Sequence, residues 1–340
     1  MPALRLASDS FCRTIIKLSG ALAIVTCPIC GSTDSTLLSR TPDYEYRSLP
    51  GEFTMLQCSG CGHGYLESPP LPEQLTEIYP PTYYTVNPHS PIHFSAFIHK
   101  QKIRRDVKRI LSLARGRPLK SIVDLGCGDA ERLAQIGERL DAPVELLGVD
   151  FQPDIAREDA LRKRGVQLVN DNIEGNLDEL RDGGHDLLIS CQTLEHLYDP
   201  AAALRTWARK LAPGGLLLIE TPNKGGLDFV LFKRRYWGFY HTPRHFHVFT
   251  TDSLERAVAQ SGLAVRERGF IPSGSMILSL RNALGLNSVA PGPRFGEFIS
   301  NKNILVVGSS GAFDLLLIAL GLPTSNQFVL ATRDARKIRV

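Results

Sequence analysis

The chain has 340 residues, of which 22% are charged and 43% hydrophobic, and its formal net charge at pH 7 is only +4. This composition fits a cytosolic protein of two domains, so we expect a cytoplasmic location. The basic residues are scattered, which is not the charge distribution of a nucleic-acid-binding protein.

Residues 1–26 precede the first motif. Within them, an apolar run at residues 18–25 follows Arg13 and Lys17 and superficially resembles a signal peptide. The thiol-rich motif that follows argues against export. We interpret residues 1–26 as a loosely ordered extension, part of which reflects a start codon assigned too far upstream.

Two CxxC turns follow, and each is succeeded by a glycine. Two thiolates from one tight turn can reach a single tetrahedral ion, and the glycine lets backbone amides turn toward the sulfurs. Four ligands leave no open coordination position, so the ion is expected to be structural. The spacing predicts a zinc ribbon over residues 27–67, with Zn²⁺ held by Cys27, Cys30, Cys58 and Cys61.

Disulfides are the rival interpretation of these cysteines. CxxC pairs favour a metal, and Cys127 and Cys191 are left without partners. His63 is a substitute ligand in principle, but we expect it to face solvent. The gap at residues 32–57 is longer than in the usual ribbon, so we expect a hairpin or a loop there.

A Pro- and Tyr-rich linker spans residues 68–99. Its tyrosines can stack on sugar faces or anchor the linker onto the next domain, and both interpretations stay open. Residues 100–117 are rich in lysine and arginine and predict an amphipathic helix with a solvated basic face, packed before the first strand of that domain.

Residues 121–130 form an apolar strand that ends in Asp124 and runs into Gly126 and Gly128. These glycines lack the Cβ atoms that would keep a ligand off the backbone. A second strand at residues 145–150 ends in Asp150, where a carboxylate can accept both hydroxyls of a ribose. The pattern indicates an α/β sheet that binds a nucleoside.

The acidic residues of the turn indicate which nucleoside. A dinucleotide fingerprint needs a glycine at position 131, where this chain has Glu131, with Asp129 close by. Two carboxylates at a helix N-terminus repel phosphate. S-adenosylmethionine has no phosphate but carries a sulfonium and an amino group, so the turn favours it over NAD, FAD or ATP.

These residues resemble class I S-adenosylmethionine-dependent methyltransferases. The resemblance runs over roughly residues 100–335 and places the catalytic domain at 100–340, with an apolar insertion at about 271–326. It implies an α/β, Rossmann-like seven-stranded methyltransferase sheet with helices on both faces, beside the small zinc ribbon. Further strands are expected at residues 166–169, 185–190, 211–220, 264–270 and 327–333.

The resemblance also implies a set of cofactor residues. The acid of the first motif contacts the methionine end through backbone or water, the acid of the second strand takes the ribose, and an acid near residue 171 accepts the adenine amino group. Ala130 departs from the family, in which many members have another glycine at this place. The expected cofactor-binding residues are Asp124, Gly126, Cys127, Gly128, Asp150, Phe151, Asp171, Asn172, Ile173 and Cys191.

Histidines and aromatic residues are concentrated at positions 236–247. The segment resembles methyltransferases with a Pro-x-His-x-x-x-Phe-Thr pattern that shapes the acceptor site. A histidine near neutrality can take a proton from the acceptor, so His245, His241 and His196 are candidate bases in that order, although each can instead be structural. His241, His245 and His247 are an alternative metal site, disfavoured because no carboxylate has suitable spacing.

The insertion contains two apolar runs, at residues 303–307 and 312–322, which are too short to span a bilayer. We expect a buried or dimer-forming helix there. Docking on a membrane or a lipid-linked acceptor is the alternative, which would make the protein peripheral to a membrane.

Zinc-ribbon methyltransferases of bacterial sugar and polysaccharide pathways share a Leu-x-x-Tyr-x-x-x-Tyr-Tyr stretch, similar to Leu75, Tyr79, Tyr83 and Tyr84 here. This resemblance implies O- or C-methylation of a sugar, nucleotide sugar or related small metabolite. The alternatives are an RNA methyltransferase that grips nucleic acid with the ribbon, and an inactive methyltransferase-fold scaffold. The loop at 191–194, after the strand at 185–190, lacks the Asn-Pro-Pro-Tyr type of motif that is used on base amines, which disfavours an RNA acceptor.

Overall fold

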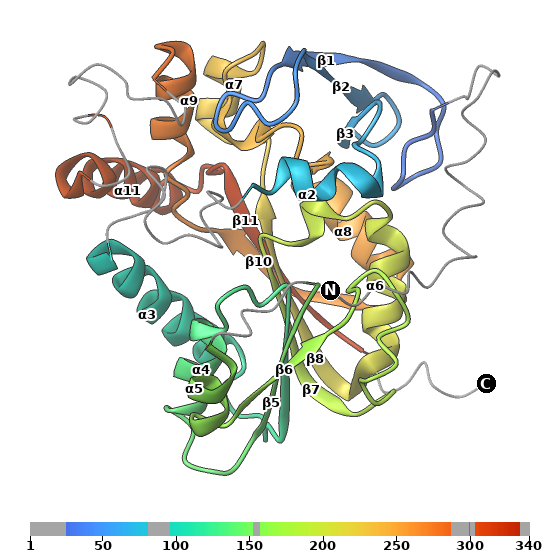
Figure 1. The fold of residues 1–340 in the computed structure, drawn as a ribbon, viewed down its shortest axis with the longest axis vertical. Coiled ribbons are helices and arrows are strands. Elements are labelled where there is room, and N and C mark those ends of the chain that lie inside the picture. The colour runs from blue at the N-terminus through green and yellow to red at the C-terminus, as the bar shows by residue number, and fades with distance from the viewer. Residues whose placement is uncertain (1–24, 81–95, 152–156, 287–298, 300–302, 334–340) are drawn as a thin grey trace.

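The structure is a computed structural model that describes residues 25–80, 96–151, 157–286, 299 and 303–333 (Figure 1). The N-terminal extension up to residue 24, and Tyr83 and Tyr84 of the linker, therefore lie outside the described residues.

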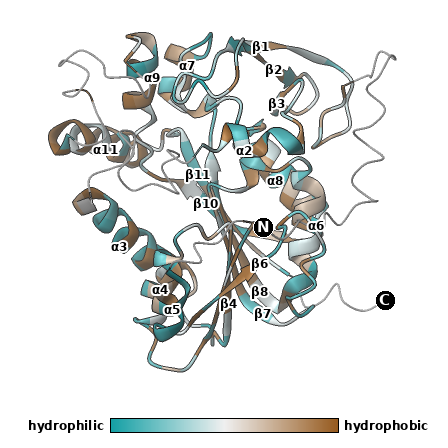
Figure 2. Ribbon diagram, viewed as in Figure 1, coloured by the Kyte–Doolittle hydropathy of each residue, from teal (hydrophilic) through white to brown (hydrophobic). Residues whose placement is uncertain are grey.

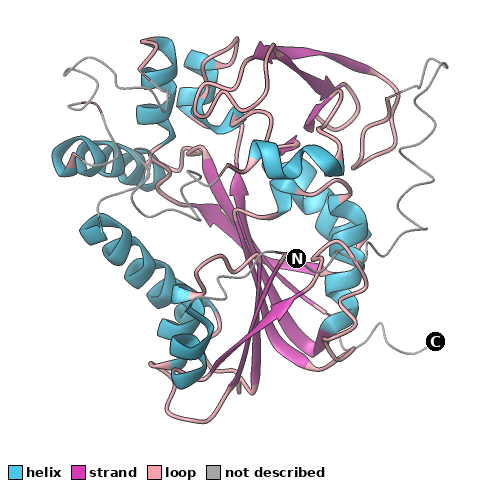
Figure 3. Cartoon of the chain, viewed as in Figure 1, coloured by secondary structure: helices cyan, strands magenta, loops and turns pink. Residues whose placement is uncertain are grey.

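A seven-stranded sheet forms the centre of the molecule (Figure 3). Its strands, in spatial order, are β10 (Ala264–Phe270), β11 (Asn326–Thr332), β8 (Leu211–Pro222), β7 (His185–Cys191), β4 (Ser121–Leu125), β5 (Glu145–Asp150) and β6 (Val166–Asn170). Strands β8, β7, β4, β5 and β6 are mutually parallel, whereas β11 is antiparallel to both of its neighbours. The predicted fold class is confirmed, including the closing strand after the insertion.

Helices cover both faces of this sheet (Figure 1). One face carries α3 (Ala96–Leu113), α4 (Glu131–Gly137) and α5 (Glu158–Lys163), and the other carries α6 (Pro200–Lys210) and α8 (Thr251–Gln260). In α3, Ile103, Val107 and Ile110 recur at helical spacing and are at most 5% exposed. This apolar stripe packs α3 onto the sheet, so the predicted amphipathic helix forms. Most of its basic side chains are exposed, whereas Arg109 contacts the buried carboxylate of Glu220 on β8.

The cysteine-bearing segment forms a second, four-stranded sheet. Strands β1 (Ser35–Thr41) and β2 (Phe53–Cys58) form an antiparallel hairpin, which confirms the hairpin expected within residues 32–57. Strand β3 (Gly64–Leu66) pairs with β2 and also with β9 (His247–Val248), which comes from far along the chain. Two short helices, η2 (Pro72–Gln74) and α2 (Leu75–Ile78), then begin the linker.

The insertion is helical. It contains α9 (Ser275–Ala283) and α11 (Ile304–Ala319), and α7 (Leu227–Phe232) lies nearby (Figure 1). Buried Asp314 accepts hydrogen bonds from the backbone N–H of Ser273 (2.7 Å) and from its hydroxyl (3.2 Å), which ties α11 to the start of α9.

Helix α11 is not buried within this chain, contrary to one of the two expectations for it. Leu305, Leu315 and Leu320 are 75%, 58% and 64% exposed, and Figure 2 shows the helix as mostly hydrophobic. No helix among the described residues is long and apolar enough to cross a membrane. A second copy of the chain, or lipid, as the partner of α11 stays a prediction.

Candidate functional site

The carboxyl ends of β4, β5 and β6 meet at one edge of the sheet, where the glycine turn lies. Gly126 and Gly128 both have positive φ, +74° and +55°. A Cβ on Gly126 would lie 2.5 Å from the hydroxyl oxygen of Thr193, which itself donates to the Leu125 carbonyl at 3.1 Å. The turn and the loop after β7 are therefore in close contact, which only a glycine permits.

Asp124 is fully buried beneath this turn. Its Oδ2 lies 3.4 Å from Nη1 of Arg132, while its Oδ1 is buried without a hydrogen-bond partner among the described residues. Burial raises the pKa of Asp124 to about 6, and the nearby Arg132 opposes that rise. The unpartnered oxygen is an acceptor available to a donor from a ligand, consistent with the expected contact to the methionine end.

Asp150 accepts a hydrogen bond from the backbone N–H of Gly128 at 2.9 Å, so the ribose acid also closes the glycine turn. Phe151 follows it and is half exposed. The Asp171 N–H lies 3.3 Å from the Asp150 carbonyl, which brings Asp171, exposed Asn172 and buried Ile173 to the same edge. The structure thus gathers the cofactor residues predicted from β4, β5 and β6.

Two predicted cofactor residues have buried side chains. The Cys127 sulfur would lie 2.9 Å from a Cβ on Gly148, so this thiol points into the sheet, and only its backbone is left for a ligand. Cys191 ends β7 and is 7% exposed. Burial raises the pKa of both thiols well above the usual value, so both stay protonated.

Nearby arginines compensate the negative charge of the acidic residues in the turn, which the sequence alone did not indicate. Arg164 contacts Glu131 at 2.8 Å, and Arg157 lies 3.5 Å from both Glu131 and Asp129. The hydrogen bond from Arg164 lowers the pKa of Glu131, so the carboxylate stays ionised but is compensated. The fit to S-adenosylmethionine therefore rests on Asp124, Asp150 and the bare glycine turn more than on repulsion of phosphate.

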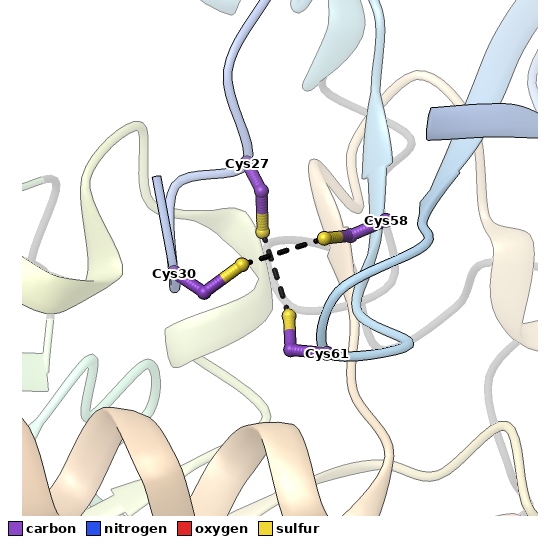
Figure 4. Close-up of side chains that lie close together, drawn as sticks. All are labelled: Cys27, Cys30, Cys58 and Cys61. Carbon is purple, nitrogen blue, oxygen red and sulfur yellow. Dashed lines mark hydrogen bonds between the residues drawn. The ribbon is translucent and has the colours of Figure 1, made fainter. Parts of the chain in front are cut away.

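The four CxxC cysteines come together in one cluster (Figure 4). Cys27 and Cys61 sulfurs are 3.6 Å apart, and those of Cys30 and Cys58 are 3.4 Å apart. A disulfide requires about 2.05 Å, whereas tetrahedral Zn–S bonds of about 2.3 Å place the sulfurs roughly 3.7 Å apart. The Gly60 N–H donates to the Cys58 sulfur at 3.3 Å, as in structural zinc sites. The cluster fits Zn²⁺ better than disulfides.

His63 does not face solvent, contrary to expectation, and it lies outside the cysteine cluster. It is fully buried, and its Nε2 lies 3.1 Å from Nδ1 of His247. His247 uses its other nitrogen to donate to the Leu197 carbonyl at 2.8 Å. Both nitrogens of His247 are engaged, so the alternative metal site of His241, His245 and His247 is not formed.

The three candidate bases do form a cluster. The ring centroids of His196 and His245 are 4.7 Å apart, and those of His241 and His245 are 4.8 Å apart. The cluster lies between the short helix η4 (Leu194–His196), which follows β7, and the segment after η5 (Gly238–Tyr240). Tyr79 of the linker reaches His196, with its hydroxyl 3.0 Å from Nδ1, and lies 6.3 Å from the Phe151 ring.

Two carboxylates that the sequence did not single out join these histidines. Glu45, from the segment between β1 and β2, contacts Nδ1 of His241 at 2.7 Å, and Glu195 Oε1 lies 4.0 Å from Nε2 of His245. Glu195 could have been found from the sequence because it adjoins His196 in the chain. Glu45 could not, because 196 positions separate it from His241.

Burial dominates the ionisation of this cluster. It lowers the pKa of His196 to about 3 and the pKa of His245 well below the usual value, with neighbouring histidines acting in the same direction. Burial also raises the pKa of Glu195 to about 8. Both imidazoles are therefore neutral at physiological pH and carry a lone pair on one nitrogen.

A buried arginine connects this region to the cysteine-bearing sheet. Arg244 is 0% exposed, contacts Asp43 at 2.7 Å, and donates from Nε to the Ile78 carbonyl at 2.8 Å. Although burial alone would raise it, the hydrogen bond and charge of Arg244 hold the pKa of Asp43 at about 2. The pair fixes the segment that carries His241 and His245.

A family model described as a methyltransferase domain matches residues 96–268, slightly more than half of the chain. A trans-aconitate 2-methyltransferase of Deinococcus radiodurans is 38% identical over 109 residues, covering 31% of this chain and 39% of that protein. A ubiquinone biosynthesis O-methyltransferase of Azorhizobium caulinodans is 30% identical over 124 residues, covering 34% and 46%. The chain thus spans less than half the length of either relative. A solved methyltransferase from Archaeoglobus fulgidus is 16% identical, with a TM-score of 0.43 over 69% of this chain and 98% of that one.

Proposed function

This chain belongs to the methyltransferase domain family, and we propose that it transfers a methyl group from S-adenosylmethionine to a small-molecule acceptor. The observation that carries the proposal is the edge of the sheet where buried Asp124, the turn at Gly126 and Gly128, and Asp150 converge. When bound there, S-adenosylmethionine supplies a methyl group on a sulfonium centre.

Each residue of this edge has one task in the proposal. Asp150 accepts the ribose hydroxyls, and Asp171 with Asn172 faces the adenine. Asp124, whose Oδ1 is a buried acceptor with no partner in the residues that the structure describes, holds the methionine end. Gly126 keeps the turn close to the Thr193 loop, so that the cofactor can lie against bare backbone.

Proton removal from the acceptor falls to the histidine cluster. The sequence-based order put His245 first, but the contacts favour His241 as the base. Its Nδ1 donates to Glu45 at 2.7 Å, and this orients the ring and leaves Nε2 with the lone pair.

For the acceptor we propose a sugar, a nucleotide sugar or a related hydroxyl-bearing metabolite. The two relatives named above are, by their names, a trans-aconitate methyltransferase and a ubiquinone biosynthesis O-methyltransferase, which supports a small molecule. Tyr79 lies between Phe151 of the cofactor edge and His196 of the cluster, a position from which its ring can contact a sugar face.

The test begins with native mass spectrometry of protein purified without added cofactor, followed by calorimetry with S-adenosylmethionine. We expect one cofactor per chain, then methylation within a panel of sugars and nucleotide sugars. Absence of binding after the cofactor is added would favour an inactive scaffold. Binding together with tight, salt-resistant retention on heparin, and no methylation of small molecules, would favour an RNA acceptor.

A further inference from the structure

Glu195, His196 and His245 place one ligand atom each within 4.8 Å of one another. We propose that these three side chains form a second metal site, a two-histidine, one-carboxylate site for a divalent first-row ion such as Mn²⁺. Such a triad occupies one side of an octahedral ion and leaves the other positions open. This site differs from the cysteine cluster in both ligands and location.

Both imidazoles are set in the tautomer that a metal needs. Nδ1 of His245 donates to the Phe239 carbonyl at 2.9 Å, and Nδ1 of His196 donates to the Arg244 carbonyl at 3.0 Å, with the Tyr79 hydroxyl oxygen also 3.0 Å away as a second acceptor. A carbonyl oxygen only accepts, so each Nδ1 carries the proton and each Nε2 carries the lone pair. Metal-binding histidines are oriented by such outer contacts.

Glu195 is the observation that points to a missing ligand. Its side chain is 0% exposed; Oε2 accepts from the Thr221 hydroxyl at 2.9 Å, whereas Oε1 is buried without a hydrogen-bond partner in the described part of the chain. This same oxygen lies 4.0 Å from Nε2 of His245. Bonds of about 2.1 Å to one ion allow donor separations from roughly 3.0 Å at a right angle to 4.2 Å in line. The pair at 4.0 Å can therefore hold one ion at a wide angle, and the arrangement on one side of the ion requires the two donors to approach by about 1 Å when it binds.

The proposed role rests on the proposed function. An ion with open positions would hold an acceptor oxygen and increase its acidity, while His241, engaged with Glu45 outside the triad, takes the proton. His196 is only partly buried and forms the accessible edge of the site.

The probe is Mn²⁺ alone, added to full-length protein with its zinc content checked by elemental analysis. Soft thiolates do not select Mn²⁺, so the cysteine cluster does not compete for it. We expect one Mn²⁺ per chain, with pulsed electron paramagnetic resonance of the ¹⁵N-histidine-labelled protein showing coupling to two imidazole nitrogens. Binding without histidine coupling, or no binding, would overturn the proposal.

Variants then assign the ligands. Glu195→Gln and His245→Gln should each weaken Mn²⁺ binding at least tenfold. Thr221→Val removes only the outer hydrogen bond to Glu195 and should weaken Mn²⁺ binding about tenfold. His185→Asn, a buried histidine on β7 outside the triad, is the control and should leave the affinity unchanged. Equal affinity of Glu195→Gln and wild type would overturn the site. S-adenosylmethionine binding is measured separately, so failure of the metal site and failure of the proposed function remain distinguishable.

Discussion

Two features of the backbone at position 126 require a glycine. Its φ is +74°, and a Cβ there would lie 2.5 Å from the stiff side chain of Thr193. We expect Gly126→Ala to destabilise the fold by about 3 kcal/mol, adding left-handed strain to overpacking, and to abolish S-adenosylmethionine binding as the Thr193 loop shifts. Urea unfolding and calorimetry measure the two effects.

Gly116 provides the matched control, because it has a φ of +78° but no atom within 4 Å of a Cβ. Gly116→Ala should cost only the conformational part, about 1 kcal/mol, and leave cofactor affinity intact. Equal losses of stability for both variants would show that the Thr193 contact contributes nothing.

Asp150 is the residue on which the ribose assignment depends. Replacing it with alanine removes the charge-assisted bonds to two hydroxyls, so Asp150→Ala should weaken S-adenosylmethionine binding by about 2 kcal/mol, roughly 30-fold. Asp150 also accepts from Gly128 N–H, and Asp150→Asn can keep this bond while losing the charge. Calorimetry on both variants separates the two contributions.

A fall in affinity for Asp150→Ala but not for Asp150→Asn would mean that the residue acts only through the turn. Glu158→Ala, on α5, removes a carboxylate that pairs with Arg162 instead, and serves as the charge control. Unchanged affinity for Asp150→Ala would contradict the ribose assignment.

At the scale of elements, the central strands of the large sheet were predictable because most of them are short apolar runs followed by a turn signal, whereas the edge strand β10 is largely polar and exposed. Strand β9 was not, since two residues, His247 and Val248, carry no periodicity. The cofactor edge could be predicted because parallel strands bring their carboxyl ends together. The contacts of Glu45 and Asp43 with the histidine segment could not, because they depend on how two sheets pack.

Ala130 shows how a departure from the family pattern is accommodated. It has a φ of +52°, is fully buried, and stands at the N-terminus of α4. The glycine common at this place in the family would adopt that conformation without strain, which explains the family's preference. The surrounding core holds the alanine in a conformation it seldom adopts.

The Asp43–Arg244 pair should make stability fall in acid. The folded pKa of Asp43, about 2, lies below its ordinary value of 3.8, so its stabilisation is present above pH 4 and is lost as the pH falls toward 2. Asp43→Asn should cost about 3 kcal/mol at pH 7, because it leaves buried Arg244 without its carboxylate. Urea unfolding from pH 2 to 7 should show that the difference in the free energy of unfolding between wild type and Asp43→Asn becomes smaller below pH 4.

The control for this pair is the exposed contact between Glu158 and Arg162. Glu158→Gln should change the free energy of unfolding by well under about 1 kcal/mol at any pH. If the difference in the free energy of unfolding between wild type and Asp43→Asn stays constant down to pH 2, ionisation of Asp43 is not what stabilises its contact with Arg244.

On the scale of the whole molecule, the cysteine-bearing sheet and the seven-stranded sheet share one core. Strand β9, which lies far along the chain, pairs with β3, and Lys224 donates to Gln57 at 2.5 Å. The apolar cluster that contains Leu254 and Val258 of α8 also contains Cys27, Ile29, Cys58 and Tyr65. The two sheets are therefore expected to unfold together, in one cooperative transition.

Zinc should then stabilise the entire chain and not only its N-terminal part. Because metal binding to the four cysteines contributes to folding, chelation of zinc or Cys58→Ser should lower the melting temperature of the single transition by about 10 °C, equivalent to roughly 7 kcal/mol for a chain of this length. Elemental analysis should show loss of one zinc per chain. Cys191→Ser, a buried thiol outside the cluster, should keep its zinc. Two separate calorimetric transitions, with the S-adenosylmethionine-sensitive one unchanged by chelation, would contradict a shared core. A single transition that moves as a whole would mean that zinc also holds β9, and with it His245, in place for the acceptor.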